Sequence, residues 1–319
     1  MILDLMKKIT LGKKRGLDFP KFTMTLPEHL LNLFKRFFPY FNMSILKVKT
    51  REGYTVKVLS ELLQGCLKDA CFNINNKGIS LIGVDTKSRN GTILVDLELD
   101  KNNFQTFKSP ENKSFPIGTN LIHLHKMLKP IKKKDFLTLL IDKERPSDLG
   151  IKIGPNGENG STISYLVITN INPVEVDIPD GYNNPIKTTA KEFQKLKTLN
   201  KLSKQIKVVS DGNVISFFAG KENLWSRQVN LGEPDEDDSE KEKKIVYSQT
   251  FETGKIIRLV KMAGLSSIIQ IYTKPDLPLK FELNVGTLGK IRVYIKSEET
   301  IEAERDDEEN QSGIVPVDK

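Results

Sequence analysis

Few residues of this chain could take part in catalysis or metal binding, and their spacing matches no known site. His123 and His125 lie two apart in an amphipathic segment, so they point to different faces of a helix and suit a shared metal poorly. Asp85 has no evident partner carboxylate, and the Gly-rich stretch 154–162 lacks the lysine of a phosphate-binding loop. The sequence therefore predicts no catalytic residue, no metal site and no cofactor.

Lysine is the residue type that the sequence organises most clearly. Four segments with helical spacing of apolar residues each carry lysine on the opposite, polar side. One such helix is usually just a solvated face, but four in one chain indicate a basic surface built from helices. Lysine is a point charge on a flexible stem that suits phosphate oxygens without fixing a base edge. The expected polyanion contact is therefore loose and independent of base sequence.

The charge distribution supports this interpretation. The net charge is +8, with 49 Lys and Arg against 41 Asp and Glu. Acids are concentrated in the loop 233–242 and in the tail 298–319, while the remaining body is basic. A basic body with acidic appendages suits DNA, because bound lysines release condensed counterions.

The cysteines and apolar runs favour a chain that stays inside the cell. Cys66 and Cys71 lie five apart in a helical pattern, which suits neither a disulfide framework nor a metal knuckle. No apolar run approaches the ~20 residues of a membrane span, and the N-terminus lacks a signal-peptide cleavage pattern. We expect no membrane partner and a reducing compartment.

The periodicity predicts an α+β plan that occurs twice. Helices are expected near 56–72, 120–129, 190–204 and 253–263, with antiparallel strands between them. Setting LKDACFNINNKGISLIGVD beside LNKLSKQIKVVSDGNVISFFAG aligns Gly78 with Gly212, which indicates two similar domains. Helices should line one face of the sheets. The predicted parts are an N-terminal extension of unknown role (1–43), a first domain (44–167), an interdomain connector (168–184), a second domain (185–297) and an acidic tail (298–319).

Several stretches, in order and at similar spacing, resemble proliferating cell nuclear antigen, the PCNA family of DNA sliding clamps. They are LKDACFNINNKGISLIGVDTKS, FPIGTNLIHLHKMLK, the connector VEVDIPDGY and the terminal DLPLKFELNVGTLGKIRVYIK. The resemblance covers about Ser44 to Glu309. The first 43 residues have no counterpart in the family pattern; a membrane-surface helix and a nuclear-import signal are alternatives for them.

The resemblance implies a non-enzymatic processivity factor, a homotrimeric ring around duplex DNA with helix lysines facing the phosphates. Ring closure would join the edge strands 163–168 and 225–231 of neighbouring subunits. The lysines expected to face DNA are Lys57, Lys68, Lys126, Lys129, Lys195, Lys197, Lys201, Lys255 and Lys261.

The resemblance also implies a hydrophobic pocket beneath the connector that takes short hydrophobic-aromatic motifs of client proteins. The clients implied are a DNA polymerase, an ATP-driven clamp loader, a flap nuclease and a ligase, in the nucleus or at a cytoplasmic viral replication site. Lys296 replaces the small residue expected after the last pocket strand, which bears on client preference. The pocket residues carried over are Val84, Val176, Ile178, Tyr182, Pro278 and Tyr294.

Two other functions remain as alternatives. A clamp-like protein that has lost ring formation would act as a monomeric adaptor, and solution mass would reveal it. A DNA-processing enzyme with a basic cleft would need a metal-binding carboxylate cluster, which the sequence does not show.

Overall fold

The computed structural model of this chain describes residues 44–85, 91–110, 114–155, 160–221, 224–233 and 246–312. The predictions made for the N-terminal extension, and for most of the acidic loop 233–242, lie outside the described residues, as do the tail residues after Ser312.

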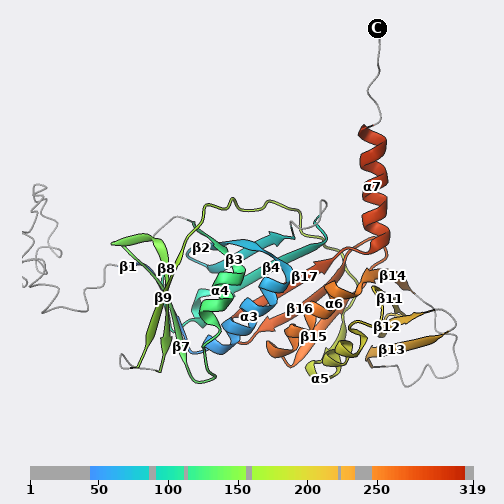
Figure 1. Cartoon of the computed structure of the whole chain (residues 1–319), viewed down its shortest axis with the longest axis horizontal. Helices are drawn as coiled ribbons and strands as arrows, with labels where there is room; N and C mark the ends of the chain where they lie inside the picture. Colours follow the sequence, from blue (N-terminus) through green and yellow to red (C-terminus); the bar gives the residue numbers. More distant parts are fainter. Residues whose placement is uncertain are drawn as a thin grey trace, which may run out of the picture. The chain divides into compact units, whose positions relative to one another are not determined.

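One pattern, a strand, a helix and three further strands, recurs four times along the described chain (Figure 1). Repeat 1 consists of β1 (Ser44–Thr50), α3 (Gly53–Cys66), β2 (Asp69–Ile74), β3 (Gly78–Val84) and β4 (Ile93–Asp100). Repeat 2 consists of β6 (Phe115–Asn120), α4 (Leu121–Leu128), β7 (Phe136–Asp142), β8 (Arg145–Gly154) and β9 (Thr162–Val167). Repeat 3 consists of β10 (Ile186–Thr189), α5 (Ala190–Phe193) with the 3-10 helix η2 (Gln194–Leu199), β11 (Gln205–Ser210), β12 (Val214–Lys221) and β13 (Trp225–Gly232). Repeat 4 consists of β14 (Tyr247–Glu252), α6 (Thr253–Arg258) with η4 (Leu259–Gly264), β15 (Ile268–Tyr272), β16 (Leu279–Val285) and β17 (Gly289–Ile295).

Three further elements of the described chain lie outside the repeats. The short helix η1 (Lys101–Asn103) and strand β5 (Thr106–Lys108) connect repeats 1 and 2, and helix α7 (Glu298–Ser312) follows repeat 4.

The described strands form three antiparallel sheets that interlock the repeats. Sheet A has the order β5-β1-β7-β8-β9, sheet B the order β10-β15-β16-β17-β4-β3-β2-β6, and sheet C the order β13-β12-β11-β14. In every repeat the first strand belongs to a different sheet from the last three. Sheet B joins the two halves of the chain, because β4 pairs with β17 from Ile93↔Ile295 to Leu99↔Gly289.

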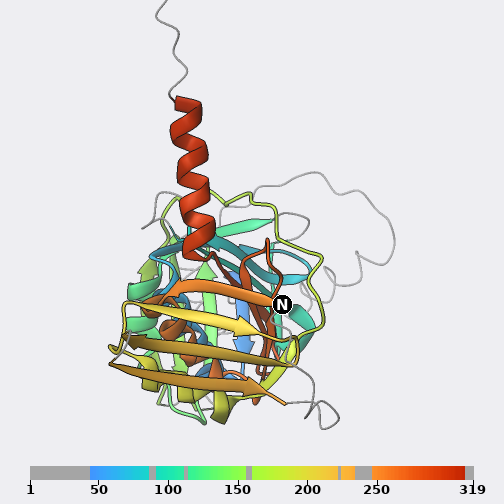
Figure 2. The same cartoon turned by 90° about the vertical axis from the view of Figure 1, so that its right-hand side faces the viewer.

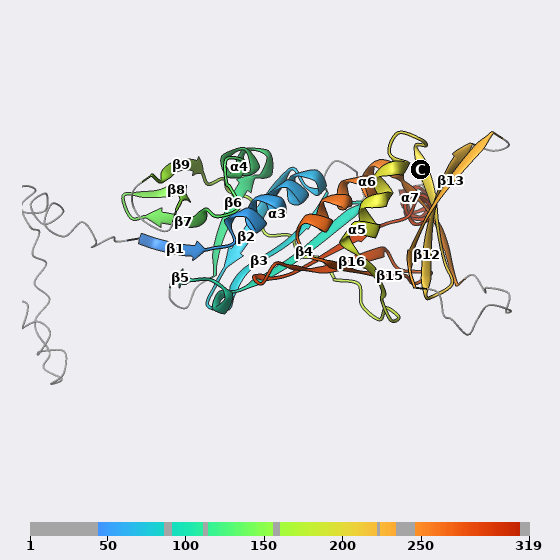
Figure 3. The same ribbon diagram turned by 90° about the horizontal axis from the view of Figure 1, so that it is seen from below.

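The helices lie together along one side of sheet B, with sheets A and C at its two ends (Figure 3). Helix α3 packs against α4 within the first half and against η4 across to the second. The apolar face predicted for the first helix is buried as expected, including Leu59, Leu62, Leu63 and Cys66. The α+β class with helices on one face of antiparallel sheets is therefore confirmed.

Local sequence signals explain where two of the helices begin. The side chain of Asn120 accepts a hydrogen bond from the His123 amide at 3.2 Å and so caps α4. Thr189 and Glu192 form a reciprocal capping box at the start of α5.

Two predicted helices are too long. The first ends at Cys66, since Leu67 is extended and residues 69–74 pair with β6 as strand β2. The third is α-helical only to Phe193, continues as a 3-10 helix to Leu199, and stops before Lys201, whose φ is +62°. In the first helix strand pairing overrides the helical pattern, because residues 69–74 join the next strand of the repeat. In the third, the chain tightens into a 3-10 helix and turns before β11 begins at Gln205.

The two glycines that the sequence aligned occupy matching hairpins. Gly78 follows β2 and opens β3, where an added Cβ would lie 1.9 Å from the Leu99 carbonyl oxygen. Gly212 lies between β11 and β12 with a φ of +106°, a conformation that L side chains rarely adopt. The same hairpin thus recurs in both halves, although one belongs to sheet B and the other to sheet C.

The first part of the acidic tail is the helix α7, which leaves the body beside β14 of sheet C (Figure 2). Ser297 caps it by accepting a hydrogen bond from the Thr300 amide at 3.1 Å. Glu298 and Glu299 lie in its first turn, where carboxylates interact favourably with the helix dipole.

Candidate DNA-facing surface and partner site

Exposed lysines lie on or directly after the helices that cover one side of sheet B. Lys126 and Lys129 are exposed at the C-terminal end of α4, and Lys68 is exposed just after α3. In the second half the exposed cations are Lys195 and Lys197 on η2, Lys201 after it, Arg258 at the end of α6 and Lys261 on η4. The helical side of the molecule therefore carries positive charge from both halves of the chain.

Lys255 does not fit the predicted role. Its side chain is only 12% exposed, and its ammonium pairs with Glu252 at 3.3 Å and with Glu298 at 3.9 Å. Because Glu298 belongs to α7, this lysine connects α6 to the C-terminal helix, and the charge is already compensated within the protein. It is better described as a structural ion pair than as a phosphate contact.

Two more of the proposed lysines have partners on the helical side. Lys57 Nζ donates to the Ile131 carbonyl at 3.1 Å and lies 5.4 Å from the centroid of the Tyr54 ring. Lys261 pairs with Glu61 of α3 at 2.5 Å, so this ion pair links the two halves of the chain across the helix layer. The Lys261 side chain stays half exposed and within reach of an external anion.

The histidines of α4 do not form a metal site. His125 Nδ1 lies 2.9 Å from Ser60 Oγ of α3, and partial burial lowers the pKa of its imidazole. His123 is exposed on another face of the helix. Among the described residues, no group of three or more His, Cys, Asp or Glu side chains is placed to hold a metal ion.

The connector joins β9 to β10 and is anchored early by a β-bridge between Thr169 and Gly118. Val176 and Ile178, both predicted pocket residues, are 42% and 39% exposed there. Apolar side chains that stay exposed close together in one segment are candidates for a surface that a partner covers.

Three tyrosines gather where the connector returns to sheet B. The Tyr182 hydroxyl donates to the Pro278 carbonyl at 2.8 Å. Its ring centroid lies 6.3 Å from that of Tyr294 and 6.0 Å from that of Tyr272. Burial raises the pKa of the Tyr294 hydroxyl to about 12, and it raises that of Tyr182 as well, so both stay neutral. The structure thus brings together three of the predicted residues, Tyr182, Pro278 and Tyr294.

The strand register extends this cluster across sheet B. Residues that pair directly on neighbouring antiparallel strands share one face of the sheet. The register therefore defines an aromatic row on the face of sheet B opposite its buried core residues: Tyr272, Lys280, Tyr294, Leu94 and Val84. This row also places the predicted residue Val84, which is half-buried, on the same face as the tyrosines.

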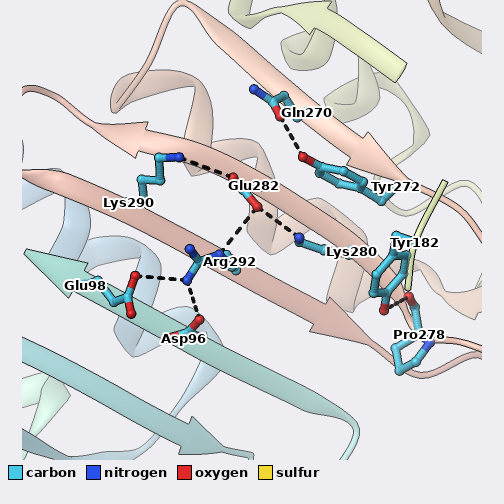
Figure 4. A network of polar contacts seen from close by, with 10 residues as sticks. All are labelled: Asp96, Glu98, Tyr182, Gln270, Tyr272, Pro278, Lys280, Glu282, Lys290 and Arg292. Carbon is cyan, nitrogen blue, oxygen red and sulfur yellow. Dashed lines mark hydrogen bonds and ion pairs between the residues drawn. The ribbon is translucent and has the colours of Figure 1, made fainter. Parts of the chain in front are cut away.

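A charged row runs beside the aromatic row, one pleat further along the strands (Figure 4). Arg292 pairs with Asp96 at 2.6 Å and Glu98 at 3.2 Å, and its Nε lies 3.4 Å from Glu282. Glu282 also pairs with Lys280 at 2.9 Å and with Lys290 at 3.8 Å. Burial raises the pKa of the Glu282 carboxyl, but these three cations together hold it below its usual value.

Sequence reasoning missed Lys280, Tyr272 and Leu94. Alternation in LKFELNV and IIQIY places Lys280 and Tyr272 on the non-core faces of their strands, so a period-2 analysis gives the face. The register that aligns them with Tyr294 depends on pairing between strands far apart in the sequence.

Strands β9 and β13 lie at the ends of sheets A and C and expose apolar side chains on an edge that pairs with no other strand in the described part of the chain. Strand β9 carries Ile163, Tyr165 and Val167, which are 45%, 43% and 64% exposed. Strand β13 begins with Trp225, 40% exposed, after Leu224, 70% exposed. An unpaired edge with apolar side chains is normally covered by another chain or element. No helix among the described residues is long and apolar enough to cross a membrane.

Comparison with known proteins identifies the family of both halves. The model described as "Proliferating cell nuclear antigen, N-terminal domain" matches residues 45–167, and the one described as "Proliferating cell nuclear antigen, C-terminal domain" matches residues 177–298.

Relatives cover the same body of the chain. The "Probable DNA polymerase sliding clamp 1" of Paramecium bursaria Chlorella virus 1 is 22% identical over 256 residues, which are 79% of this chain and 96% of the relative. "Proliferating cell nuclear antigen" of Chaetomium thermophilum is 24% identical over 259 residues, 79% and 97% of the two chains. The "Probable DNA polymerase sliding clamp" of Acanthamoeba polyphaga mimivirus is 26% identical over 290 residues, 79% of this chain and 61% of the longer relative.

Proposed function

This chain belongs to the proliferating cell nuclear antigen family of DNA sliding clamps, and we propose that three copies close into a ring that encircles duplex DNA and tethers replication proteins to it. The grip is topological, so the protein acts as a scaffold without catalysis of its own. Weak, salt-sensitive lysine contacts are adequate for a ring that must slide.

The observation that carries this proposal is the joint between β4 and β17 inside sheet B. These strands are the last of repeats 1 and 4, and they pair edge to edge. Strands β9 and β13 are the last of repeats 2 and 3, and each ends its sheet without a further strand partner among the described residues. If β9 of one copy paired with β13 of the next, the contact between subunits would have the same arrangement as the β4–β17 pairing within each subunit. Such a head-to-tail contact closes into a ring when the rotation per subunit allows it.

The exposed helix lysines support the DNA contact. Since the helices of both halves lie on one side of sheet B, closing the ring with that side inward would turn Lys126, Lys129, Lys195 and Lys197 toward the duplex. Their ammonium groups would meet phosphate oxygens irrespective of sequence.

The aromatic row and the exposed connector residues support the partner site. Client proteins such as the polymerase, the clamp loader, a flap nuclease and a ligase would lay a short hydrophobic-aromatic motif between the connector and sheet B. The relatives described above come from two viruses and from Chaetomium thermophilum, which supports the nucleus or a cytoplasmic viral replication site as the proposed site of action.

Retention on DNA tests encirclement directly. After loading, the protein should remain longer on circular DNA than on linear DNA of equal length, because a ring can leave a linear duplex only by sliding off an end. Equal retention on both would contradict the proposal. The solution mass gives a second measure: three times 36.1 kDa supports the ring, whereas a stable monomer supports a clamp-like adaptor.

A further inference from the structure

A single lysine lies within the aromatic row. Lys280 Nζ lies 4.2 Å from the centroid of the Tyr272 ring, 5.5 Å from that of Tyr182 and 5.9 Å from that of Tyr294. Its side chain is 13% exposed. The proposed partner site therefore contains a cation, which Figure 4 shows beside Tyr182 and Tyr272.

Holding an ammonium there is costly unless its charge is compensated. A charged group removed from water loses its hydration, and only opposite charges or aromatic ring faces nearby offset that loss. Three aromatic ring faces and the Glu282 carboxylate at 2.9 Å compensate Lys280 in the absence of a partner. A client with only apolar anchors would cover this ion pair and gain nothing from its charge.

The ion-pair geometry allows Lys280 to change partners. Glu282 also pairs with Arg292 and Lys290, so it keeps two cations if the Lys280 ammonium moves away. Neighbouring lysines differ in this respect. Lys274 Nζ donates to the Gly181 carbonyl at 2.8 Å, and Lys296 pairs with Glu304 of α7 at 2.6 Å.

We propose that client segments bound along the aromatic row carry a carboxylate next to their aromatic anchors, and that Lys280 is the residue that receives it. This inference rests on the proposed function and deepens it by assigning the partner chemistry. The ammonium turns from Glu282 toward the incoming carboxylate and keeps its tyrosine neighbours, in a site that the bound segment shields from water. Lys280 thus sets which client motifs bind most tightly.

The test uses synthetic peptides with two adjacent aromatic anchors and one aliphatic anchor, with Glu or Gln placed in turn at each flanking position. Their affinities for the full-length protein and for Lys280→Met are measured by fluorescence anisotropy. At one position or more, Glu should bind the wild-type protein about tenfold more tightly than Gln, as expected for a shielded charged hydrogen bond. In Lys280→Met this preference should disappear, while the Gln peptides bind at least as well as before.

Lys290→Met is the matched control. It removes a lysine that pairs with the same Glu282, but from a strand position two pleats along β17 from the aromatic row. The Glu preference should survive there. A preference that survives in Lys280→Met, or disappears equally in Lys290→Met, would show that the general field of the charged rows is responsible and would overturn the assignment.

The outcomes separate this inference from the proposed function. Gln peptides that bind as tightly as Glu peptides at every position would refute the carboxylate preference and leave the partner site intact. Failure of every peptide to bind would refute both the site and the role of Lys280. Encirclement of DNA would still be judged independently, by retention on circular and linear duplexes.

Discussion

Single lysines of the helix layer differ in how much of their charge is available to DNA. Lys126 and Lys195 are exposed, whereas Lys255 is held by Glu252 and by Glu298 of α7. Each lysine that neutralises a phosphate contributes to the salt dependence of binding through counterion release. The two groups should therefore behave differently when they are removed one at a time.

We expect Lys126→Ala and Lys195→Ala each to reduce the slope of log affinity against log salt by about 0.9. The same change at Lys255 should leave the slope unaltered. Binding of a short linear duplex at a series of salt concentrations measures this. If Lys255→Ala reduced the slope as much as Lys126→Ala, the lysine would have to leave its carboxylates when DNA binds.

At the connector, Ile178→Ala should weaken binding of an aromatic-anchored client peptide about fivefold, since roughly 1 kcal/mol of apolar burial is lost. Assembly and thermal stability should not change, because the side chain is 39% exposed. Ile122→Ala, the same substitution at an exposed position of α4, is the control and should leave peptide affinity unaltered. Tyr294 is only 2% exposed, so its truncation would confound binding with stability.

The residues of the candidate site could be predicted only in part from the sequence. Tyr182, Pro278 and Tyr294 were predicted from the resemblance, and the structure brings them into contact. Lys280 was missed because its position between Tyr272 and Tyr294 depends on the register between strands, which the local sequence pattern does not encode. Lys255 was assigned to DNA because its spacing matches the basic face, while its partner Glu298 lies in a segment that was expected to be a tail.

Among the elements, the helix α7 is one that the sequence analysis did not predict. Its first turn is tied to sheet C, where the Glu299 carboxylate accepts from the Thr250 amide at 2.9 and 3.0 Å. Burial raises the pKa of this carboxyl, but the hydrogen bonds from Thr250 and neighbouring groups outweigh it and leave the pKa below its usual value. The ionised form therefore favours the docked helix.

A pH dependence of the docking follows. Because the folded pKa of Glu299 is lowered, its contribution is present above the ordinary glutamate pKa and is lost as the pH falls through the lowered value. Hydrogen exchange at the Thr250 amide, corrected for the intrinsic rate, should accelerate over this acidic range. The amide of Val208 in the adjacent strand β11 should change less.

Glu299→Gln isolates the charge in this contact. The variant should exchange faster at Thr250 than the wild type at neutral pH, with little further change on acidification. If the Thr250 amide of this variant were as well protected from hydrogen exchange as in the wild type at neutral pH, the Glu299 carboxylate would not be what holds α7 against β14. The course of the backbone would then hold it there.

The helix boundaries show what element prediction can and cannot supply. Apolar spacing found all four helices of the repeats, because each buries one face against a sheet. It placed the ends of α3 and α5 too late, since the residues after Cys66 and Phe193 still have helical spacing but are drawn into the next strand or a tighter helix. The start of α7 was available in the sequence, because Ser297 followed by two glutamates is an N-cap signal.

For the whole molecule, the exposed edge of β9 should determine assembly. Val167→Lys places a charge where the neighbouring chain would pack, which is how natural edge strands avoid pairing. We expect the solution mass to fall from that of the proposed trimer toward 36.1 kDa while the thermal transition is retained. Sedimentation velocity measures the mass. Ile268→Lys, at an equally apolar, exposed position of a strand with neighbours on both sides, should stay trimeric.

The two similar halves of the molecule could be predicted because their repetition is visible in the sequence. The glycine alignment gave two similar halves, and the hairpins at Gly78 and Gly212 do correspond. The fourfold repeat could not be predicted from the sequence. The first strand of each repeat belongs to a different sheet from its last three strands, so the order of strands along the chain does not follow the sheets.

The pairing of β4 with β17 also bears on how an assembled ring would come apart. A trimer would contain two classes of junction with the same strand geometry. Three would lie within chains, reinforced by the covalent connector and by a core that is continuous across them, and three would rely on non-covalent contact alone. A clamp loader that opens the ring by force would therefore separate it at a subunit boundary. Each subunit would remain folded while the ring opens and closes.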